Sequence, residues 1–202
     1  MKKGFKKPLV AVASAFLFAA SFASALAPTT WNLDSSHSNV NFTVDYLVVS
    51  EVDGRFGKVE GAIQGTKDDF SDATATITID VNSINTDNEK RDGHLKSADF
   101  FDVANHPNIT FKANNFKKVK GNQYKITGDL TMRGVTKKIT MDAQHLGNKK
   151  DGYGNMRSFW KANFAVNRQD YGVSWKNTTQ AGEAVVGDEV RMKINAQFVM
   201  AK

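Results

Sequence analysis

The chain has no cysteine among its 202 residues and no apolar run long enough to cross a bilayer. The lack of cysteine excludes disulfide bonds, thiolate catalysis and covalent haem attachment. The longest apolar run, Leu9 to Phe22, has about 14 residues and is rich in Ala and Ser, whereas a membrane-spanning helix needs about 20 apolar residues. We therefore predict a protein that does not span the membrane, and a chain of this length can bury a substantial core in one domain.

The N-terminus has the pattern of a secretory signal peptide. Four lysines stand within the first seven residues, the short apolar run follows, and the run ends in the small residues ASFASALA. A basic start, a short apolar region and a small-x-small cleavage site are typical of exported proteins. We predict that residues 1–25 are a cleaved signal peptide, that residues 26–202 form the mature domain, and that the protein is located in the periplasm.

The mature part also lacks an excess of basic charge. Four of the 27 basic residues lie in the signal, which leaves 23 basic and 21 acidic residues, since the signal has no acidic residue. A nucleic-acid-binding domain needs a clear basic excess. We therefore expect no nucleic-acid partner, and the lysine clusters FKKVK, VTKK and GNKK are predicted to be solvated strand ends and turns.

Motifs for catalysis or metal binding are sparse. The four histidines are spread along the chain without metal-ligand spacing, and no G-x-S-x-G is present. The segment GYGNMR begins like a dinucleotide-binding motif but has Arg157 where the third glycine belongs. We therefore predict no metal site, no cofactor and no enzymatic activity; the alternative is an enzyme or redox accessory that acts on a lipid or quinone.

What the mature chain does have is alternation of apolar and polar residues. It appears in VNFTVDY, ATATITIDV, YKITGDLTMRGVTKKITMDA, FWKANFAV and VRMKINAQFVM. Strict alternation is typical of β-strands with one buried and one solvated face. With the shorter runs near Trp31, Val59 and Phe111, the pattern predicts about eight to ten antiparallel strands that pack as a sandwich or close into a barrel.

The segment RDGHLKSADFF, residues 91–101, departs from this alternation. TDNE, Thr86 to Glu89, has the form of a capping box, so a short helix is predicted to begin there. His94, Ala98 and Phe101 stand at helical spacing and would form its apolar stripe. Such a helix, near residues 88–101, can pack on the sheet or across the end of a barrel.

Six segments carry a family resemblance: WNLDSSHSNVNFTV, RFGKVEGAI, SINTDNEKRDGHLKSADFFDVANHPNITF, GDLTMRGVTKKI, RQDYGVSW and VGDEVRMKI. In this order they resemble the YceI-like family of polyisoprenoid-binding proteins, over essentially all of residues 30–200. The resemblance implies an eight-stranded antiparallel, lipocalin-like β-barrel, usually periplasmic, that holds a long isoprenoid or fatty chain in its lumen. An eight-stranded barrel is wide enough for one slender apolar ligand.

In such a barrel the core and the ligand pocket are the same surface, so the predicted ligand-binding residues are mostly aromatic. They are Phe42, Phe56, His94, Leu95, Phe101, Phe111, Phe164 and Trp175. We expect residues 91–101 to form a lid, with Leu95, Ala98 and Phe101 closing the lumen and Arg91 and Asp92 at the wet rim. His94 is placed equally well as a structural residue or facing a ligand head group, and two barrels could pair through an exposed strand edge as a homodimer.

Overall fold

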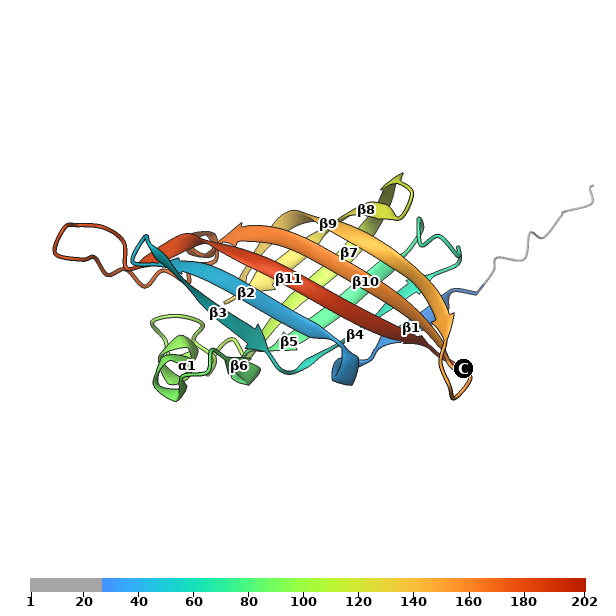
Figure 1. The fold of residues 1–202 in the computed structure, drawn as a ribbon, viewed down its shortest axis with the longest axis horizontal. Helices are drawn as coiled ribbons and strands as arrows, with labels where there is room; N and C mark the ends of the chain where they lie inside the picture. The colour runs from blue at the N-terminus through green and yellow to red at the C-terminus, as the bar shows by residue number, and fades with distance from the viewer. Residues whose placement is uncertain (1–26) are drawn as a thin grey trace, which may run out of the picture.

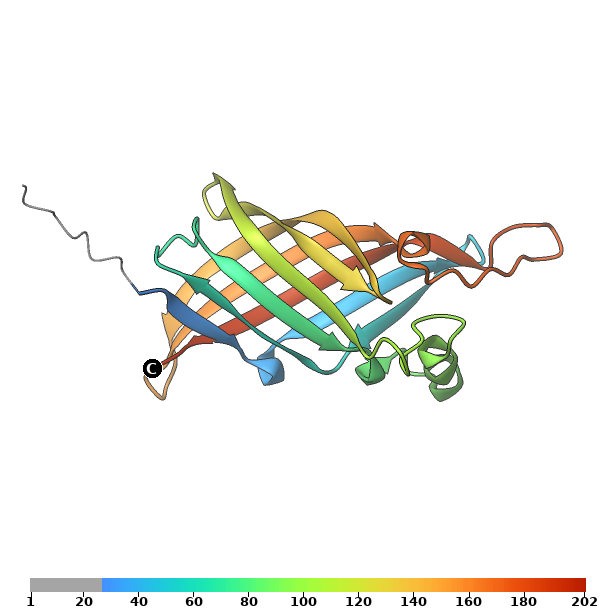
Figure 2. The same cartoon turned by 180° about the vertical axis from the view of Figure 1, so that it is seen from behind.

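The computed structural model describes residues 27–202, so the predicted signal peptide, residues 1–25, lies outside the described residues. One antiparallel sheet wraps around a common interior (Figures 1 and 2). The described strands are β1 Thr29–Leu33, β2 Asn39–Tyr46, β3 Ser50–Phe56, β4 Val59–Gly65, β5 Thr74–Asp80, β6 Ile84–Asn85, β7 Asn108–Lys120, β8 Gln123–Met132, β9 Val135–Lys150, β10 Met156–Asn167 and β11 Val186–Met200. The helix α1 spans Glu89–Lys96.

The strand order shows a closed meander. Neighbours run β1-β4-β5-β7-β8-β9-β10-β11-β2-β3-β6, and β1 also pairs with β11, with Trp31 opposite Met200. Three long strands are each broken once: β1 from β2 by the 3₁₀ helix Ser35–His37, β3 from β4 at residues 57–58, and β5 from β6 by the 3₁₀ helix Val81–Ser83. With each broken pair counted as one strand, the described residues form a closed eight-stranded antiparallel barrel, which confirms the predicted fold.

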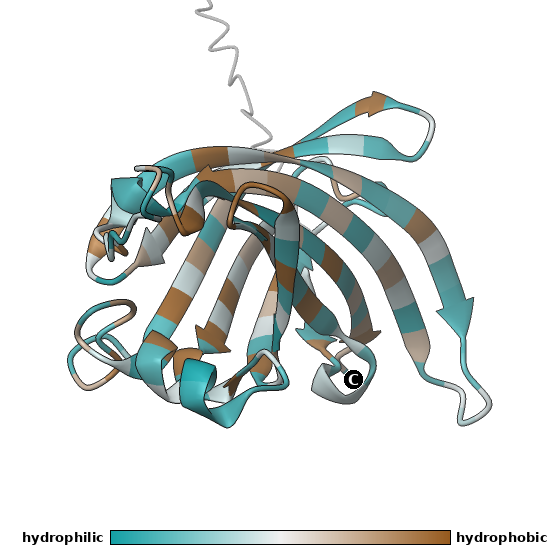
Figure 3. Ribbon diagram, turned by 60° about the vertical axis from the view of Figure 1, so that its left-hand side comes forward, coloured by the Kyte–Doolittle hydropathy of each residue, from teal (hydrophilic) through white to brown (hydrophobic). Residues whose placement is uncertain are grey.

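Alternation along the strands places one row of side chains in the interior. In β8 every second residue from Tyr124 to Met132 is buried, and Figure 3 shows the same alternation of apolar and polar residues along neighbouring strands. Two clusters of buried side chains fill the two halves of the barrel, and half-buried residues such as Phe111, Phe164 and Ile194 pack against both. The interior is therefore one continuous apolar column.

Glycines allow the strands to approach closely where the barrel curves. A Cβ at Gly128 of β8 would lie 2.7 Å from the Cα of Ala113 on β7. A Cβ at Gly54 of β3 would overlap the ring of Phe42, which is opposite it on β2. Glycine at such positions admits a neighbouring backbone or ring, which is a common device for curving a sheet.

The helix is confirmed, but Thr86 is not its capping residue. Asn88 caps it, because its side-chain oxygen accepts a hydrogen bond from the Arg91 amide at 3.0 Å. Asp87 has a φ of 58°, so the chain turns left-handed just before Asn88 and a helix cannot extend back to Thr86. The Thr86 hydroxyl instead donates to the Asp92 carboxylate at 2.6 Å.

The predicted apolar stripe is also wrong in part. The helix ends at Lys96, where Ser97 donates its amide to the His94 carbonyl, so Ala98 and Phe101 lie beyond it. Ala98 is exposed, and no residue of α1 is fully buried. The helix lies at one end of the barrel beside β6 (Figure 1), and it contacts the interior through Leu95 and the segment that follows it.

Candidate functional site

The barrel surrounds a lumen of about 200 Å³. A water molecule takes up about 30 Å³ in the liquid, so the lumen has room for several groups of that size. Six of the predicted residues line it: Phe42, Phe56, Leu95, Phe101, Phe111 and Phe164. The rest of the lining is also mostly apolar, with Ser38, Asn39, Lys161, Arg168 and Asn195 as the polar exceptions.

Aromatic rings connect the wall of the lumen to the mouth. The ring of Phe42 lies 5.6 Å from that of Phe56, and Phe56 meets Phe101 edge-to-face at 6.2 Å. Phe42 and Phe56 come from the paired strands β2 and β3, whereas Phe101 comes from the segment after α1. Half-buried Leu95 lines both the lumen and the mouth pocket, whereas half-buried Phe101 lines the lumen alone.

His94 and Trp175 do not line the lumen itself; they line a second pocket at its mouth. This mouth pocket shares Phe42, Val44, Leu95, Phe100 and Val186 with the lumen. The Asp99 carboxylate accepts a hydrogen bond from Nε2 of the exposed His94 ring at 3.1 Å, and this ring contacts Trp175 edge-to-face at 5.6 Å. The predicted set therefore divides into a lumen group and a mouth group that adjoin each other.

Phe100 is the residue that the sequence reasoning missed. Its ring is 6% exposed, stacks on Trp175 at 5.3 Å and meets His94 at 5.0 Å. The adjacent phenylalanines in ADFF were the available signal. In an irregular segment no period shows which of two neighbours points inward, so the sequence could not rank Phe100 above Phe101.

Arg91 and Asp92 hold the rim of the mouth through Thr86. The Arg91 guanidinium donates to the Thr86 hydroxyl at 2.8 Å and to its carbonyl oxygen at 2.7 Å, and Asp92 accepts from the Thr86 amide at 2.9 Å. Both residues thus hold the loop through Thr86. Arg91 and Thr86 also line the mouth pocket, so the rim presents polar groups beside an apolar interior.

Buried Arg168 fixes the long loop on the other side of the mouth. Its guanidinium donates to the carbonyl oxygens of Val173 and Trp175 at 2.9 and 3.0 Å, and to those of Gly187 and Val186 at 2.8 and 3.2 Å. The Asp188 carboxylate lies 3.1 Å away. Burial lowers the pKa of Arg168; arginine nevertheless keeps its charge in proteins. The loop is therefore held at both ends by one side chain.

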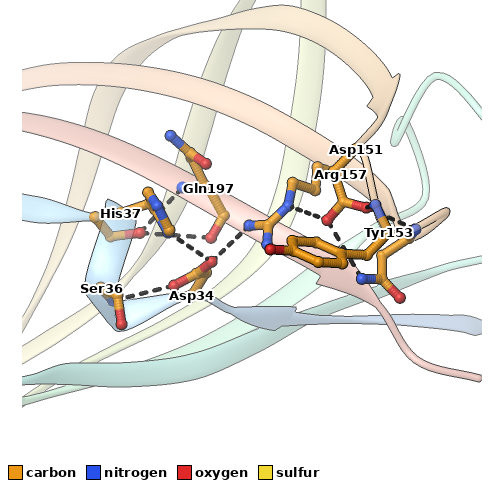
Figure 4. Close-up of polar contacts among 9 residues, drawn as sticks. Asp34, Ser36, His37, Asp151, Tyr153, Arg157 and Gln197 are labelled. Carbon is orange, nitrogen blue, oxygen red and sulfur yellow. Dashed lines mark hydrogen bonds and ion pairs between the residues drawn. The ribbon is translucent and has the colours of Figure 1, made fainter.

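The β9–β10 end of the barrel is tied by ion pairs (Figure 4). Arg157 on β10 donates to Asp34 at 2.5 Å and to Asp151 at 2.8 Å, and the Tyr153 amide donates to Asp151 at 2.9 Å. Hydrogen bonds from Arg157 hold the pKa values of both carboxyls below their usual range. His37, in the 3₁₀ helix between β1 and β2, pairs with Asp34 at 2.9 Å.

A serine and a histidine meet outside the lumen without forming a usable catalytic pair. The Ser158 hydroxyl lies 3.2 Å from His145 Nε2 and accepts from the Trp160 indole at 3.0 Å. Burial lowers the pKa of His145. Ser158 is fully buried and does not line the lumen, so a substrate in the cavity could not reach its hydroxyl. Within residues 27–202, no three His, Asp or Glu side chains gather as metal ligands would.

The β2–β3 connection has a surface feature that alternation did not predict. Leu47 and Val48 have φ values of 51° and 66°, and Val49 is 90% exposed. A left-handed conformation costs a residue with a branched side chain about 1–2 kcal/mol, and consecutive left-handed residues in hairpins are usually Asn-Gly. The turn therefore carries apolar residues at a conformational cost.

Comparison with known proteins identifies the family. A family model described as the YceI-like domain matches residues 31–198. The chain belongs to the YceI-like family. A UPF0312 protein of Staphylococcus aureus is 35% identical over 175 residues, which cover 86% of this chain and 99% of that protein.

Solved structures of YceI-like proteins share the fold. The Campylobacter jejuni YceI protein is 28% identical, with a TM-score of 0.66 over 78% of this chain and 90% of that chain. A polyisoprenoid-binding domain from Saccharophagus degradans, implicated in plant cell wall breakdown, is 19% identical, with a TM-score of 0.63 over 88% and 100% of the two chains. At that identity the second likeness concerns the fold alone. Within residues 27–202 of this YceI-like chain, no helix has the length and apolar character needed to traverse a membrane.

Proposed function

We propose that this protein is an exported carrier that binds a long-chain isoprenoid or related amphiphilic lipid in its lumen. The observation that supports this most strongly is the continuous lumen, whose walls are apolar and whose mouth is bordered by polar groups. An amphiphile could bury its chain among the phenylalanines and leave its head near Arg91 and His94. Burial of apolar surface would supply the binding energy, about 25 cal/mol per Å².

The membership in the YceI-like family and the naming of the Saccharophagus structure as a polyisoprenoid-binding domain agree with this proposal. Loose specificity follows from the lining, because a methyl-branched hydrocarbon offers few polar handles to an apolar wall. Transport, storage or sequestration would all use the same cavity. Pairing of two barrels as a homodimer stays a prediction.

Location in the periplasm is part of the proposal and follows from the N-terminal lysines and the short apolar run. One preparation tests export and binding together. The full chain is expressed in a Gram-negative host, the periplasmic fraction is purified, and native mass spectrometry is followed by lipid extraction. We expect a protein that begins at Leu26 and carries one apolar lipid per barrel. Protein that begins at Met1 in the membrane fraction would contradict export, and an empty barrel would contradict the carrier.

A pair of tryptophan variants locates the ligand. Phe164 is half-buried and lines the lumen, whereas Leu146 is 49% exposed on β9. Phe164→Trp should displace lipid from a folded barrel because it fills volume without adding charge, and Leu146→Trp should leave the lipid in place. Full lipid content in folded Phe164→Trp would place the ligand elsewhere.

A further inference from the structure

Four consecutive side chains at the turn between β2 and β3 are exposed and apolar or aromatic. We call residues 46–49 the apolar tip; Tyr46 is 39% exposed, Leu47 37%, Val48 64% and Val49 90%. Figure 1 shows this turn at the same end of the barrel as α1, and Figure 3 brings that end forward. We propose that the apolar tip inserts into the surface of a lipid bilayer and docks the mouth of the barrel there; this rests on the proposed lipid-binding function.

Packing within the fold does not explain why Val48 and Val49 are apolar. Val49 is almost fully exposed, so it contributes little to packing. Val48 is the one β-branched residue among the six non-glycine residues with positive φ in the described part of the chain, and such a residue is a conformational outlier in that region. Asn and Gly would fit this backbone better and would be more soluble. The apolar side chains therefore serve something outside the barrel.

The size and shape of the apolar tip favour a bilayer over a protein partner. A stable protein–protein interface buries about 800 Å² and roughly 20–30 residues on each side, far more than one projecting turn provides. Interfacial membrane binding needs only a few apolar side chains that reach the boundary between head groups and acyl chains. A convex turn meets this requirement, because a bilayer deforms around it.

Charges below the apolar tip indicate which bilayer it fits. On the neighbouring strand β11, Arg191 donates to Asp45 of β2 and to Glu51 of β3 at 2.8 Å each. This set has one positive and two negative charges, so it gives no attraction to an anionic surface. We therefore expect docking on a neutral, zwitterionic bilayer, with the ion pairs among the head groups and little dependence on salt.

The apolar tip also adjoins the route into the lumen. Tyr46 lines the mouth pocket, and the neighbouring β2 residues Val44 and Phe42 line both the mouth pocket and the lumen. The Leu47 amide donates to the Val185 carbonyl at 2.9 Å, which fixes the tip against the loop on the other side of the mouth. A lipid that leaves a bilayer at the tip would therefore enter the barrel without crossing bulk water.

Flotation with phosphatidylcholine vesicles tests the proposal on the mature chain. The double variant Leu47→Asn with Val48→Gly removes the apolar side chains and suits the left-handed backbone. We expect it to bind vesicles at least about tenfold more weakly than wild type, with an unchanged or higher Tm. Val49→Asp should weaken flotation similarly. The control is Val119→Asn, an exposed valine at 58% near the β7–β8 turn, which should float like wild type.

Failure of wild type to float, equal flotation of the double variant, or equal loss in the control would each overturn the docking proposal. Binding of a fluorescent prenyl lipid dispersed in detergent micelles separates this from the carrier function. The double variant should bind it with wild-type affinity, and loss of this binding too would assign the tip to the barrel's own structure and overturn docking. Wild type that floats but binds no prenyl lipid would leave docking standing and refute the carrier.

Discussion

Leu95 and Phe101 offer the sharpest test of whether the segment after Asn88 acts as a lid. Both are half-buried and line the lumen near its mouth. Full burial of such side chains is worth about 1.5–3 kcal/mol each. Leu95 and Phe101 are only partly buried and already border the open lumen. We therefore expect the double alanine substitution to lower the free energy of unfolding of the ligand-free protein by about 2–3 kcal/mol. In a domain of this size that lowers Tm by about 5–10 °C.

Ligand release should become much faster in the same variant. The same two side chains would contact the bound lipid and block its exit, and a loss of about 2–3 kcal/mol from the bound state corresponds to release that is about 30–150-fold faster. Stopped-flow transfer of a fluorescent prenyl lipid to acceptor vesicles measures this rate, and calorimetry of the delipidated protein measures Tm.

Ile139→Ala is the matched control for the lid. Ile139 is also half-buried and packs on both core clusters, but it does not line the lumen. It should lower Tm by a similar few degrees and leave the release rate within about threefold of wild type. If the Leu95 and Phe101 double variant also releases lipid at the wild-type rate while Tm falls, the segment is ordinary core and the lid hypothesis is refuted.

Two further predictions follow from the glycines and from the ion pairs. Gly54→Ala would push the Phe42 ring from its place over β3 toward the lumen, so lipid content should fall and overpacking should cost about 1–3 kcal/mol; native mass spectrometry and thermal unfolding check this, and unchanged lipid content would contradict it. The carboxyls of Asp34, Asp72 and Asp151 have lowered pKa values in the fold, about 2 for Asp72, whose carboxylate accepts from the Thr66 hydroxyl and amide. Their contribution to stability is therefore present above the unfolded pKa near 3.8 and lost as pH falls from about 4 toward 2. When unfolding is measured across this pH range, the stability of wild type should fall more steeply with acid than that of Asp151→Asn. Identical pH profiles would refute the role of the ion pair between Asp151 and Arg157.

Alternation predicted most of the barrel because strand faces depend on a local period. Every second residue faces the interior from Tyr124 to Met132 and from Trp160 to Val166, as their spacing indicated. The breaks at Ser35–His37 and Val81–Ser83 were not visible, because a single 3₁₀ turn has no period of its own. The N-cap of α1 was wrongly assigned to Thr86, because Thr86 and Asn88 are both residues that favour this position and the sequence does not show that Asp87 between them is left-handed.

The site was predictable where it coincides with the core and not where it depends on distant contacts. Phe42, Phe111 and Phe164 belong to alternating runs, so their inward direction could be inferred. The role of Arg168 could not, since it is defined by carbonyl oxygens up to 19 residues away in the chain. The exposure of Val48 and Val49 was also hidden, because an apolar turn looks in sequence like the end of a buried strand.

The position of Arg168 has a consequence for how this scaffold could change over evolutionary time. Its guanidinium donates hydrogen bonds to the carbonyl oxygens of Val173 and Trp175 at the start of the loop and of Val186 and Gly187 at its end. Val185 is tied to Leu47, but the residues from Asn177 to Glu183 form backbone hydrogen bonds within the loop, so insertions or replacements around Thr179 to Gly182 would leave the strands undisturbed. The loop can therefore accept inserted sequences, and new recognition segments could arise beside the mouth while the barrel itself stays unchanged.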